Sequence, residues 1–68
     1  MIIHENGKKY RVWLRAGYAH IHSERQLRAI IERTINALPP ADQLVLRKLT
    51  LWQLMGVWGM TSKKTEII

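Results

Sequence analysis

The dipeptide Asn6-Gly7 is the feature that most constrains the fold of this chain. It lies between the segment Ile2-Ile3-His4-Glu5 and the segment Lys8 to Arg15, in which polar and apolar residues alternate. A type I′ turn needs two residues that tolerate positive φ angles, and Asn-Gly meets this need best. The sequence therefore predicts an antiparallel β-hairpin at the N-terminal end.

The second predicted strand has two chemically different faces, because alternate side chains of a strand point to opposite sides. One face carries Tyr10, Val12 and Leu14. The other carries Lys9, Arg11, Trp13 and Arg15. Cations neutralise phosphates and an exposed aromatic ring can stack on a base, so this second face is typical of a nucleic-acid surface. The alternatives are a solvated face whose Trp13 packs under arginine stems, or a Trp13 covered by the C-terminal helices.

A third strand is predicted after a turn at Ala16-Gly17, because residues 18–22 alternate again. It would add Tyr18, His20 and His22 to the polar face of the sheet. Two histidines two residues apart on a strand lie about 7 Å from each other, and His4 could complete a three-histidine zinc site. Since no carboxylate or cysteine stands at ligand spacing, we expect ordinary surface histidines and no cofactor.

An amphipathic helix is predicted from Ser23 to Leu38. Ser23 and Gln26 have the spacing of a capping box, and apolar residues then recur every three or four positions. Pro39-Pro40 ends this helix, because proline cannot donate within a helix and disfavours helical geometry at the preceding residue.

Two short helices are predicted in the remaining chain. Pro40 or Ala41 opens the first of them, which would offer Leu44, Val45, Leu46 and Leu49 to the core. Thr50 and Gln53 repeat the capping-box spacing, and they predict a helix from Leu51 to about Trp58. Gly59 would then be its C′ residue.

Together these elements define one small α+β domain over residues 1–68: an N-terminal antiparallel β-hairpin or three-stranded meander packed by an amphipathic helix, then two short C-terminal helices. The predicted core consists of Ile3, Tyr10, Val12, Leu14, Ile21, Leu27, Ile30, Ile31, Ile35, Leu38, Leu44, Leu49, Leu54 and Trp58.

Two resemblances to DNA-binding families follow from this layout. The order of three short strands and one helix over residues 10–38 resembles the small arm-type DNA-binding domains of tyrosine recombinases, which implies contact with DNA through the sheet. Residues 49–64 are similar to a helix-turn-helix with Gly59 at the turn, although Met55 and Thr65 depart from that pattern. The second resemblance implies a recognition helix that begins with Thr61, Ser62, Lys63 and Lys64. The alternative is a plain buried helix followed by a frayed basic tail.

The predicted helix from Leu51 to Trp58 is apolar on nearly every side, so we expect several of its sides to be buried. The core of this chain, a second copy of the chain or another protein could bury it. Trp and Met are enriched in protein interfaces, which favours the last two alternatives. If a partner buries the helix, we expect Trp52, Met55 and Trp58 to make the contact. A protein-binding adaptor or inhibitor is therefore the competing function.

Composition narrows the function classes further. The 68 residues contain 11 Lys and Arg against 5 Asp and Glu, a net charge of +6, which favours polyanionic partners. There is no cysteine, and no Gly-rich phosphate loop or plausible carboxylate pair is present, so we expect neither an enzyme nor a small-molecule substrate. The first residues lack the features of a secretory signal and no apolar stretch approaches about 20 residues, so we expect a cytoplasmic protein without membrane contact.

The leading hypothesis is a small, non-enzymatic nucleic-acid-binding protein that binds DNA rather than RNA. Its predicted contact residues are Lys9, Arg11, Trp13, Arg15, Lys63 and Lys64. A compact basic chain of this kind resembles, in type only, the accessory and regulatory proteins of phages and other mobile elements.

Overall fold

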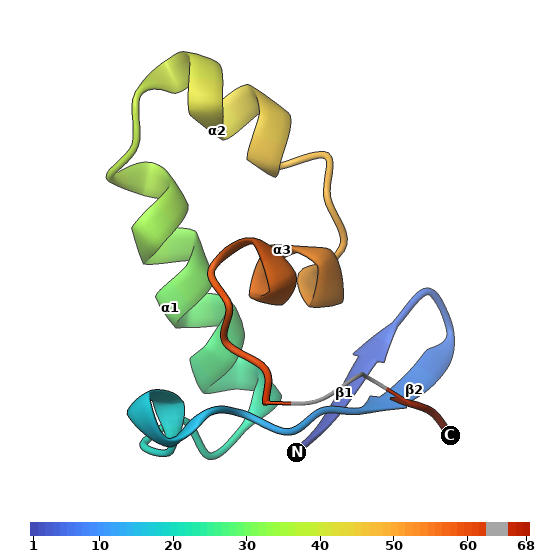
Figure 1. Cartoon of the computed structure of the whole chain (residues 1–68). Helices are drawn as coiled ribbons and strands as arrows, with labels where there is room; N and C mark the ends of the chain where they lie inside the picture. The colour runs from blue at the N-terminus through green and yellow to red at the C-terminus, as the bar shows by residue number, and fades with distance from the viewer. Residues whose placement is uncertain (63–65) are drawn as a thin grey trace.

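The computed structural model of the chain describes residues 1–62 and 66–68. Within these residues a β-hairpin is followed by a short 3-10 helix, three α-helices and a two-residue strand (Figure 1). The predicted α+β class is therefore confirmed.

The N-terminal hairpin forms as predicted from β1 (Ile2–Glu5) and β2 (Lys8–Arg11). Asn6 and Gly7 have φ angles of 53° and 74°, which are the left-handed values that a two-residue hairpin turn requires. Ile3 stands opposite Tyr10 in the antiparallel register, and Ile3 is fully buried. One face of the hairpin therefore lies on the core.

The prediction of a third strand over residues 18–22 is wrong. Residues Ala16–Tyr18 form the 3-10 helix η1, and a turn follows it. The Ala19 N–H donates to the Ala16 carbonyl, and the Ile21 N–H donates to the Tyr18 carbonyl, both at 3.1 Å. These local hydrogen bonds use amide groups that a sheet would need. The chain therefore lacks the third of the three successive strands on which the resemblance to the arm-type domains of tyrosine recombinases rests.

A different segment extends the sheet. The strand β3 (Glu66–Ile67) pairs antiparallel with β2, so the strand order is β1-β2-β3. Just before it, Leu14 and Thr61 form an isolated antiparallel bridge. The C-terminal end of the chain thus lies along β2, and nothing in the N-terminal sequence pattern predicts this pairing.

The helix α1 (Glu24–Asn36) begins at the predicted cap and ends two residues earlier than predicted. The Ser23 hydroxyl accepts a hydrogen bond from the Gln26 N–H at 3.2 Å, and the Gln26 side chain accepts one from the His22 N–H at 2.7 Å. Two of the free N–H groups near the helix start are thereby satisfied. The buried side chains of α1 are those of Leu27, Ile31 and Ile35.

The helix α2 (Pro40–Leu46) begins at the predicted proline, but the core prediction for two of its residues is wrong. Leu44 and Val45 are 68% and 63% exposed, and no residue of α2 is fully buried. Successive helical residues are about 100° apart around the axis, so three consecutive apolar residues cannot all face one core. Of the three, Leu46 is the one that packs against it.

The helix α3 (Leu51–Val57) has both caps that the sequence predicts. Thr50 and Gln53 form a complete capping box at its start. At its end Gly59 has a φ of 61°, its N–H donates to Gly56, and the Met60 N–H donates to the Met55 carbonyl at 2.9 Å. This Schellman motif turns Met60 back toward the helix, where both methionines are buried.

The substitution Gly59→Ala is expected to lower the free energy of unfolding by about 1 kcal/mol, because a Cβ disfavours the left-handed conformation. No atom would clash with the new Cβ, so the cost is conformational. The matched change Gly56→Ala, inside α3 and equally unobstructed, should instead add about 0.5 to 1 kcal/mol. Urea denaturation of both variants checks the signs, and equal effects would contradict the assigned C-cap.

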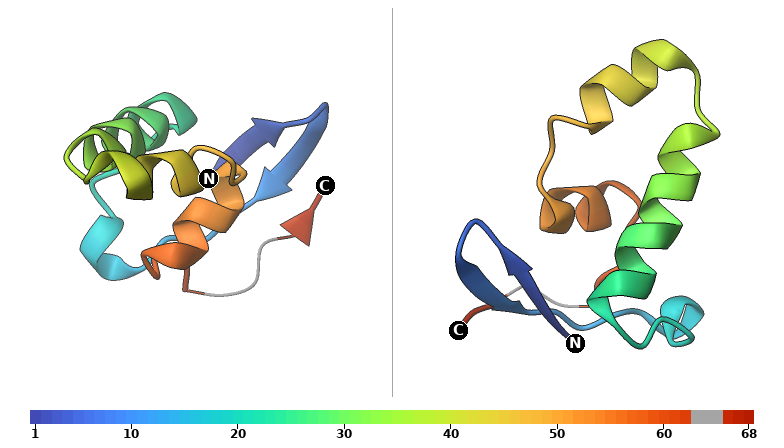
Figure 2. Two further views of the ribbon diagram at one scale, coloured as in Figure 1. Left: turned by 90° about the horizontal axis from the view of Figure 1, so that it is seen from above. Right: turned by 180° about the vertical axis from the view of Figure 1, so that it is seen from behind.

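The buried core draws on β1, α1 and α3 and on three residues of the connecting segments. It consists of Ile3, Val12, Ile21, Leu27, Ile31, Ile35, Leu51, Leu54, Met55 and Met60. Several other residues predicted for the core are only partly buried, namely Tyr10, Leu14, Ile30, Leu38, Leu49 and Trp58. Both figures place the hairpin at one end of the molecule and α2 at the other, with α3 between them (Figures 1 and 2). In the part of the chain that the structure describes, no helix has both the length and the apolar character needed to cross a membrane.

Candidate nucleic-acid interface

The hairpin presents Lys9 and Arg11 on the side opposite the core. Lys9 and Arg11 are exposed, whereas the intervening Tyr10 packs against the core and the following Val12 is fully buried. The predicted alternation along β2 is thus confirmed. No ion pair joins Lys9 or Arg11 to a residue whose side chain the structure describes, and the register places Glu66 of β3 opposite Arg11.

Sequence reasoning missed two members of this surface. The register pairs His4 with Lys9 and Ile2 with Arg11, so both residues of β1 lie on the same face as the cations. Both are exposed. The Asn6-Gly7 turn fixes this register, so the position of Ile2 and His4 beside the cations could have been predicted from the sequence. We call the surface formed by Ile2, His4, Lys9 and Arg11 the outer hairpin face.

Trp13 and Arg15 continue from β2 as an extended segment beside the C-terminal end of the chain. The Trp13 carbonyl accepts from the Ser62 N–H at 2.7 Å, and the Arg15 N–H donates to the Met60 carbonyl at 2.9 Å. The Arg15 guanidinium also donates through Nε to the Thr61 carbonyl at 3.0 Å. Arg15 is exposed and held in place, while Trp13 is half-buried.

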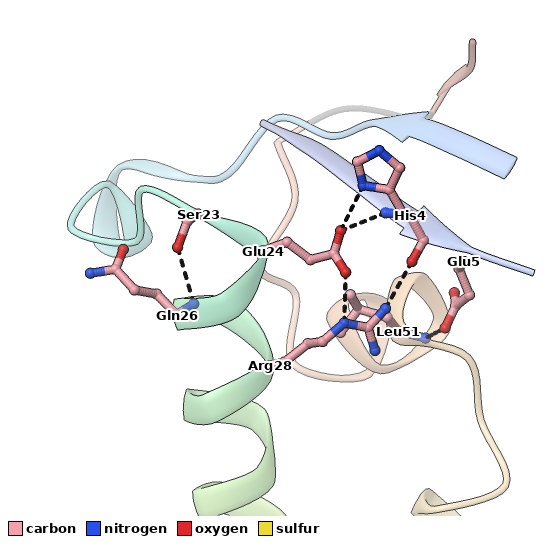
Figure 3. Close-up of polar contacts among 7 residues, drawn as sticks. All are labelled: His4, Glu5, Ser23, Glu24, Gln26, Arg28 and Leu51. Carbon is pink, nitrogen blue, oxygen red and sulfur yellow. Dashed lines mark hydrogen bonds and ion pairs between the residues drawn. The ribbon is translucent and has the colours of Figure 1, made fainter. Parts of the chain in front are cut away.

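Two charged side chains of α1 cover the free edge of β1 (Figure 3). The Glu24 carboxylate accepts from the His4 N–H at 2.6 Å and lies 3.1 Å from His4 Nδ1. Arg28 donates to the other Glu24 oxygen at 2.8 Å and to the His4 carbonyl at 2.9 Å. The pair therefore satisfies both main-chain groups of His4, as a neighbouring strand would. It fixes the hairpin to α1.

Glu5 fixes the same hairpin to α3. Its Oε2 accepts from the Leu51 N–H at 2.7 Å, which places a carboxylate at the start of that helix (Figure 3). A negative charge is favourable there because the first N–H groups of a helix have no partner within it. The hairpin that carries the outer hairpin face is therefore fixed to both α1 and α3.

Because Glu24 is ionised, the contact between the hairpin and α1 stabilises the fold to a degree that depends on pH. Burial raises the pKa of the Glu24 carboxyl, but hydrogen bonds from Arg28 and from the main chain and ring of His4, with the charge of Arg28, outweigh it. The pKa of Glu24 therefore lies below its ordinary value. Such a carboxyl stabilises the fold above its unfolded pKa, and the contribution is lost as the pH falls through the folded pKa.

The substitution Glu24→Gln is expected to cost about 1 to 2 kcal/mol of stability at neutral pH, since it removes charged hydrogen bonds at one end of the hairpin. It should also flatten the decline of the melting temperature as the pH falls below about 5, where glutamates of the unfolded chain begin to protonate. The control Glu32→Gln removes an exposed ion pair with Arg47 and should cost less than about 1 kcal/mol. Thermal unfolding across pH checks both effects, and an unchanged acid profile in Glu24→Gln would contradict the assigned link.

Tyr18, His20 and His22 do not join the outer hairpin face, because the segment that carries them is not a strand. Tyr18 packs partly against the core, and the two histidines are exposed outside the sheet. His4 is engaged with Glu24. Across residues 1–62 and 66–68, no three histidine or acidic side chains gather in an arrangement that could hold a metal ion.

The recognition helix that the helix-turn-helix resemblance implies is not formed by those of its residues that the structure describes. Thr61 forms the bridge to Leu14, Ser62 lies in a bend bonded to Trp13, and Glu66–Ile67 is the strand β3. The Schellman motif after α3 directs the chain back along β2 instead of into a second helix. The predicted contacts Lys63 and Lys64 lie outside the described residues.

The predicted protein-interface residues do not form one exposed surface. Met55 is fully buried in the core, so that part of the prediction is corrected. Trp52 is 41% exposed, and Trp58 is half-buried beside the core. The apolar character of α3 therefore mostly reflects its packing inside this chain.

Comparisons with known proteins add no further information, since no family model, curated protein or solved structure matches the chain. The account of the interface accordingly rests on the residues themselves.

Proposed function

We propose that this protein is a non-enzymatic DNA-binding protein that contacts duplex DNA through the outer hairpin face. The observation that carries the proposal is the exposure of Lys9 and Arg11 on a ribbon whose opposite face is buried. Arg15 extends this line of charge along the next segment. Lys63 and Lys64 would add phosphate contacts. The net charge of +6 supports encounter with a polyanion.

The shape of the ribbon favours DNA over RNA. The major groove of B-DNA is about 12 Å wide and admits a two-stranded β-ribbon. The major groove of A-form RNA is deep and narrow, and side chains cannot read it. Arginine and lysine on the outer hairpin face would contact phosphates and base edges, and they would release counterions as they bind. The half-buried Trp13 would add apolar contact at the end of the ribbon.

The competing proposal, a protein-binding adaptor or inhibitor that docks through α3, has less support. Of its three predicted contacts, Met55 is buried and Trp58 is half-buried. Of the three, only Trp52 is exposed enough to make the predicted contact with a partner protein. A DNA ligand agrees better with the charge distribution, and it would make the protein a cytoplasmic accessory or regulatory factor of the type used by phages and mobile elements.

Fluorescence anisotropy with labelled duplex and single-stranded oligonucleotides of random sequence tests the proposal. We expect binding to the duplex at low salt, and we expect log Kd to rise linearly with log salt concentration. Each phosphate neutralised adds about 0.9 to this slope for B-DNA. No binding to either oligonucleotide at low salt would overturn the proposal, and tighter binding to the single strand would overturn the choice of duplex.

A further inference from the structure

Only one of the two ring nitrogens of His4 has a partner among the residues that the structure describes. Nδ1 lies 3.1 Å from Oε1 of the Glu24 carboxylate. Figure 3 shows the ring turned so that Nε2 points away from Glu24. The side chain of His4 is 63% exposed and belongs to the outer hairpin face. Nε2 is therefore accessible to a ligand of that face.

The Glu24 carboxylate determines which nitrogen of the neutral ring carries the proton. Glu24 is ionised at neutral pH, because the pKa of its carboxyl lies below the ordinary value. An ionised carboxylate only accepts hydrogen bonds, so Nδ1 is the donor in this contact. A neutral imidazole has a single N–H group, which leaves Nε2 as an acceptor. Phosphate oxygens are acceptors too, so the neutral ring has nothing to donate to DNA phosphates.

A second proton on the ring turns Nε2 into a donor. In the imidazolium form both ring nitrogens donate. Nε2–H can then donate to a phosphate oxygen while Nδ1–H stays on Glu24, and the charged ring lies between two anions. Histidine gains and loses this proton between about pH 5 and pH 8.

We propose that His4 is a phosphate contact of the DNA complex that forms only when the ring is protonated, and that Glu24 is the residue that positions the ring. The inference rests on the proposed DNA binding, and it adds a contact on β1 to those on β2 and the following segment. Because protonation and binding favour each other, DNA binding is accompanied by proton uptake at this ring.

The place of His4 in the hairpin suits a contact with phosphate. The register pairs His4 with Lys9. Met1 and Val12 exchange two main-chain hydrogen bonds, of 2.9 and 3.0 Å. Since hydrogen-bonded and non-hydrogen-bonded pairs alternate along an antiparallel hairpin, His4 and Lys9 form a non-hydrogen-bonded pair, in which the side chains lie closer together. A phosphate bound by Lys9 is therefore within reach of the His4 ring.

The charges around His4 determine the direction of the effect. Glu24 contacts the ring and favours the imidazolium form. Lys9 directly opposite and Arg11 diagonally opposite on β2 disfavour it. So does Arg28, which donates to the His4 carbonyl at 2.9 Å and to Glu24. DNA phosphates offset these cations, so the bound protein holds the proton at a higher pH than the free protein.

Anisotropy titrations at pH 6 and pH 8, with a duplex whose ends carry no phosphate, test the proposal. We expect the wild type to bind about three- to tenfold more tightly at pH 6, and the slope of log Kd against log salt to be steeper there by up to about 0.9. In His4→Gln both gains should largely disappear. The glutamine amide still donates to Glu24 but takes up no proton, so the contact between the hairpin and α1 is kept.

A matched control removes the other two histidines. His20 and His22 are exposed outside the sheet, so the double variant His20→Gln, His22→Gln should keep the gain of the wild type at pH 6. The α-amino group of Met1 is present in every variant, so the difference between variants reports the histidines. A gain that survives His4→Gln, or that the double variant loses, would overturn the role of His4 while DNA binding stands. No binding at either pH would overturn the proposed function, and this contact with it.

The positioning role of Glu24 is tested in the free protein. A long-range ¹H–¹⁵N NMR spectrum at pH 8 distinguishes the ring nitrogen that carries the proton from the one that does not. We expect the neutral ring of His4 to be protonated at Nδ1 in the wild type, and to show both tautomers in Glu24→Gln, whose amide both donates and accepts. A wild-type ring protonated at Nε2 would overturn the assignment.

Discussion

Replacing Met55 with alanine is expected to remove about 2 to 5 kcal/mol from the free energy of unfolding. Met55 is fully buried in α3, and its carbonyl accepts the hydrogen bond that closes the Schellman motif. The smaller side chain would leave a cavity among residues from the hairpin, α1 and α3. A chain of 68 residues has roughly 3 to 10 kcal/mol of stability in total, so this loss would unfold a large fraction of the protein.

The contrast with Trp52→Ala makes this prediction specific. Trp52 is on the same helix but 41% exposed, so its truncation should cost much less than that of Met55. Urea denaturation followed by circular dichroism measures both. If Met55→Ala left stability unchanged and the loss fell on Trp52→Ala instead, the packing of α3 described above would be wrong.

Reversing one charge on the hairpin is expected to have the largest effect on DNA binding. Arg11→Glu removes a phosphate contact and puts a negative charge on the outer hairpin face, so the affinity for duplex DNA should fall by about tenfold or more. The slope of log Kd against log salt should also fall by about 1. Arg11 is exposed on β2, so we expect the fold to persist. Anisotropy titrations at several salt concentrations measure both quantities.

The control for this variant is Arg33→Glu, which makes the same change in net charge. Arg33 is exposed on α1, outside the sheet, so its reversal should weaken binding only slightly. Equal losses in the two variants would mean that diffuse charge, rather than the hairpin, provides the affinity.

The elements that the sequence predicted well are those whose signals are local. Asn6-Gly7 determines the turn and therefore the register of the hairpin. Ser23 and Thr50 each cap a helix through a residue three positions later, and Gly59 ends α3. In each case the determining residues lie within a few positions of one another, so the chemistry of a short segment suffices.

The failed predictions depended on tertiary contacts. Residues 18–22 alternate like a strand, yet Ile21 is the one fully buried residue among them, and local hydrogen bonds form η1. The pairing of β3 with β2 joins opposite ends of the chain, which no local pattern specifies. The exposure of Leu44 and Val45 depends on how α2 is placed after Pro39, and its apolar residues alone do not determine that.

The candidate site was partly predictable, because part of it depends only on the local alternation of residues along β2. Alternation along β2 predicted that Lys9 and Arg11 face away from the core, and they do. The half-burial of Trp13 was not predictable from that alternation, because it depends on a neighbouring segment whose Ser62 bonds to the Trp13 carbonyl. The hydrogen bonds from Glu24 and Arg28 to the main chain of His4 were also not predictable, because they connect α1 to the edge of β1.

The most direct measurement is a two-dimensional ¹⁵N–¹H NMR titration of the labelled protein with a short random duplex at low salt. The account predicts that the largest shift changes fall on the outer hairpin face and the following segment, from Lys9 to Arg15, while α2 changes little. Shift changes concentrated instead at the exposed α1 arginines Arg25 and Arg33, or no changes at all, would contradict the assignment of the hairpin as the DNA-binding surface.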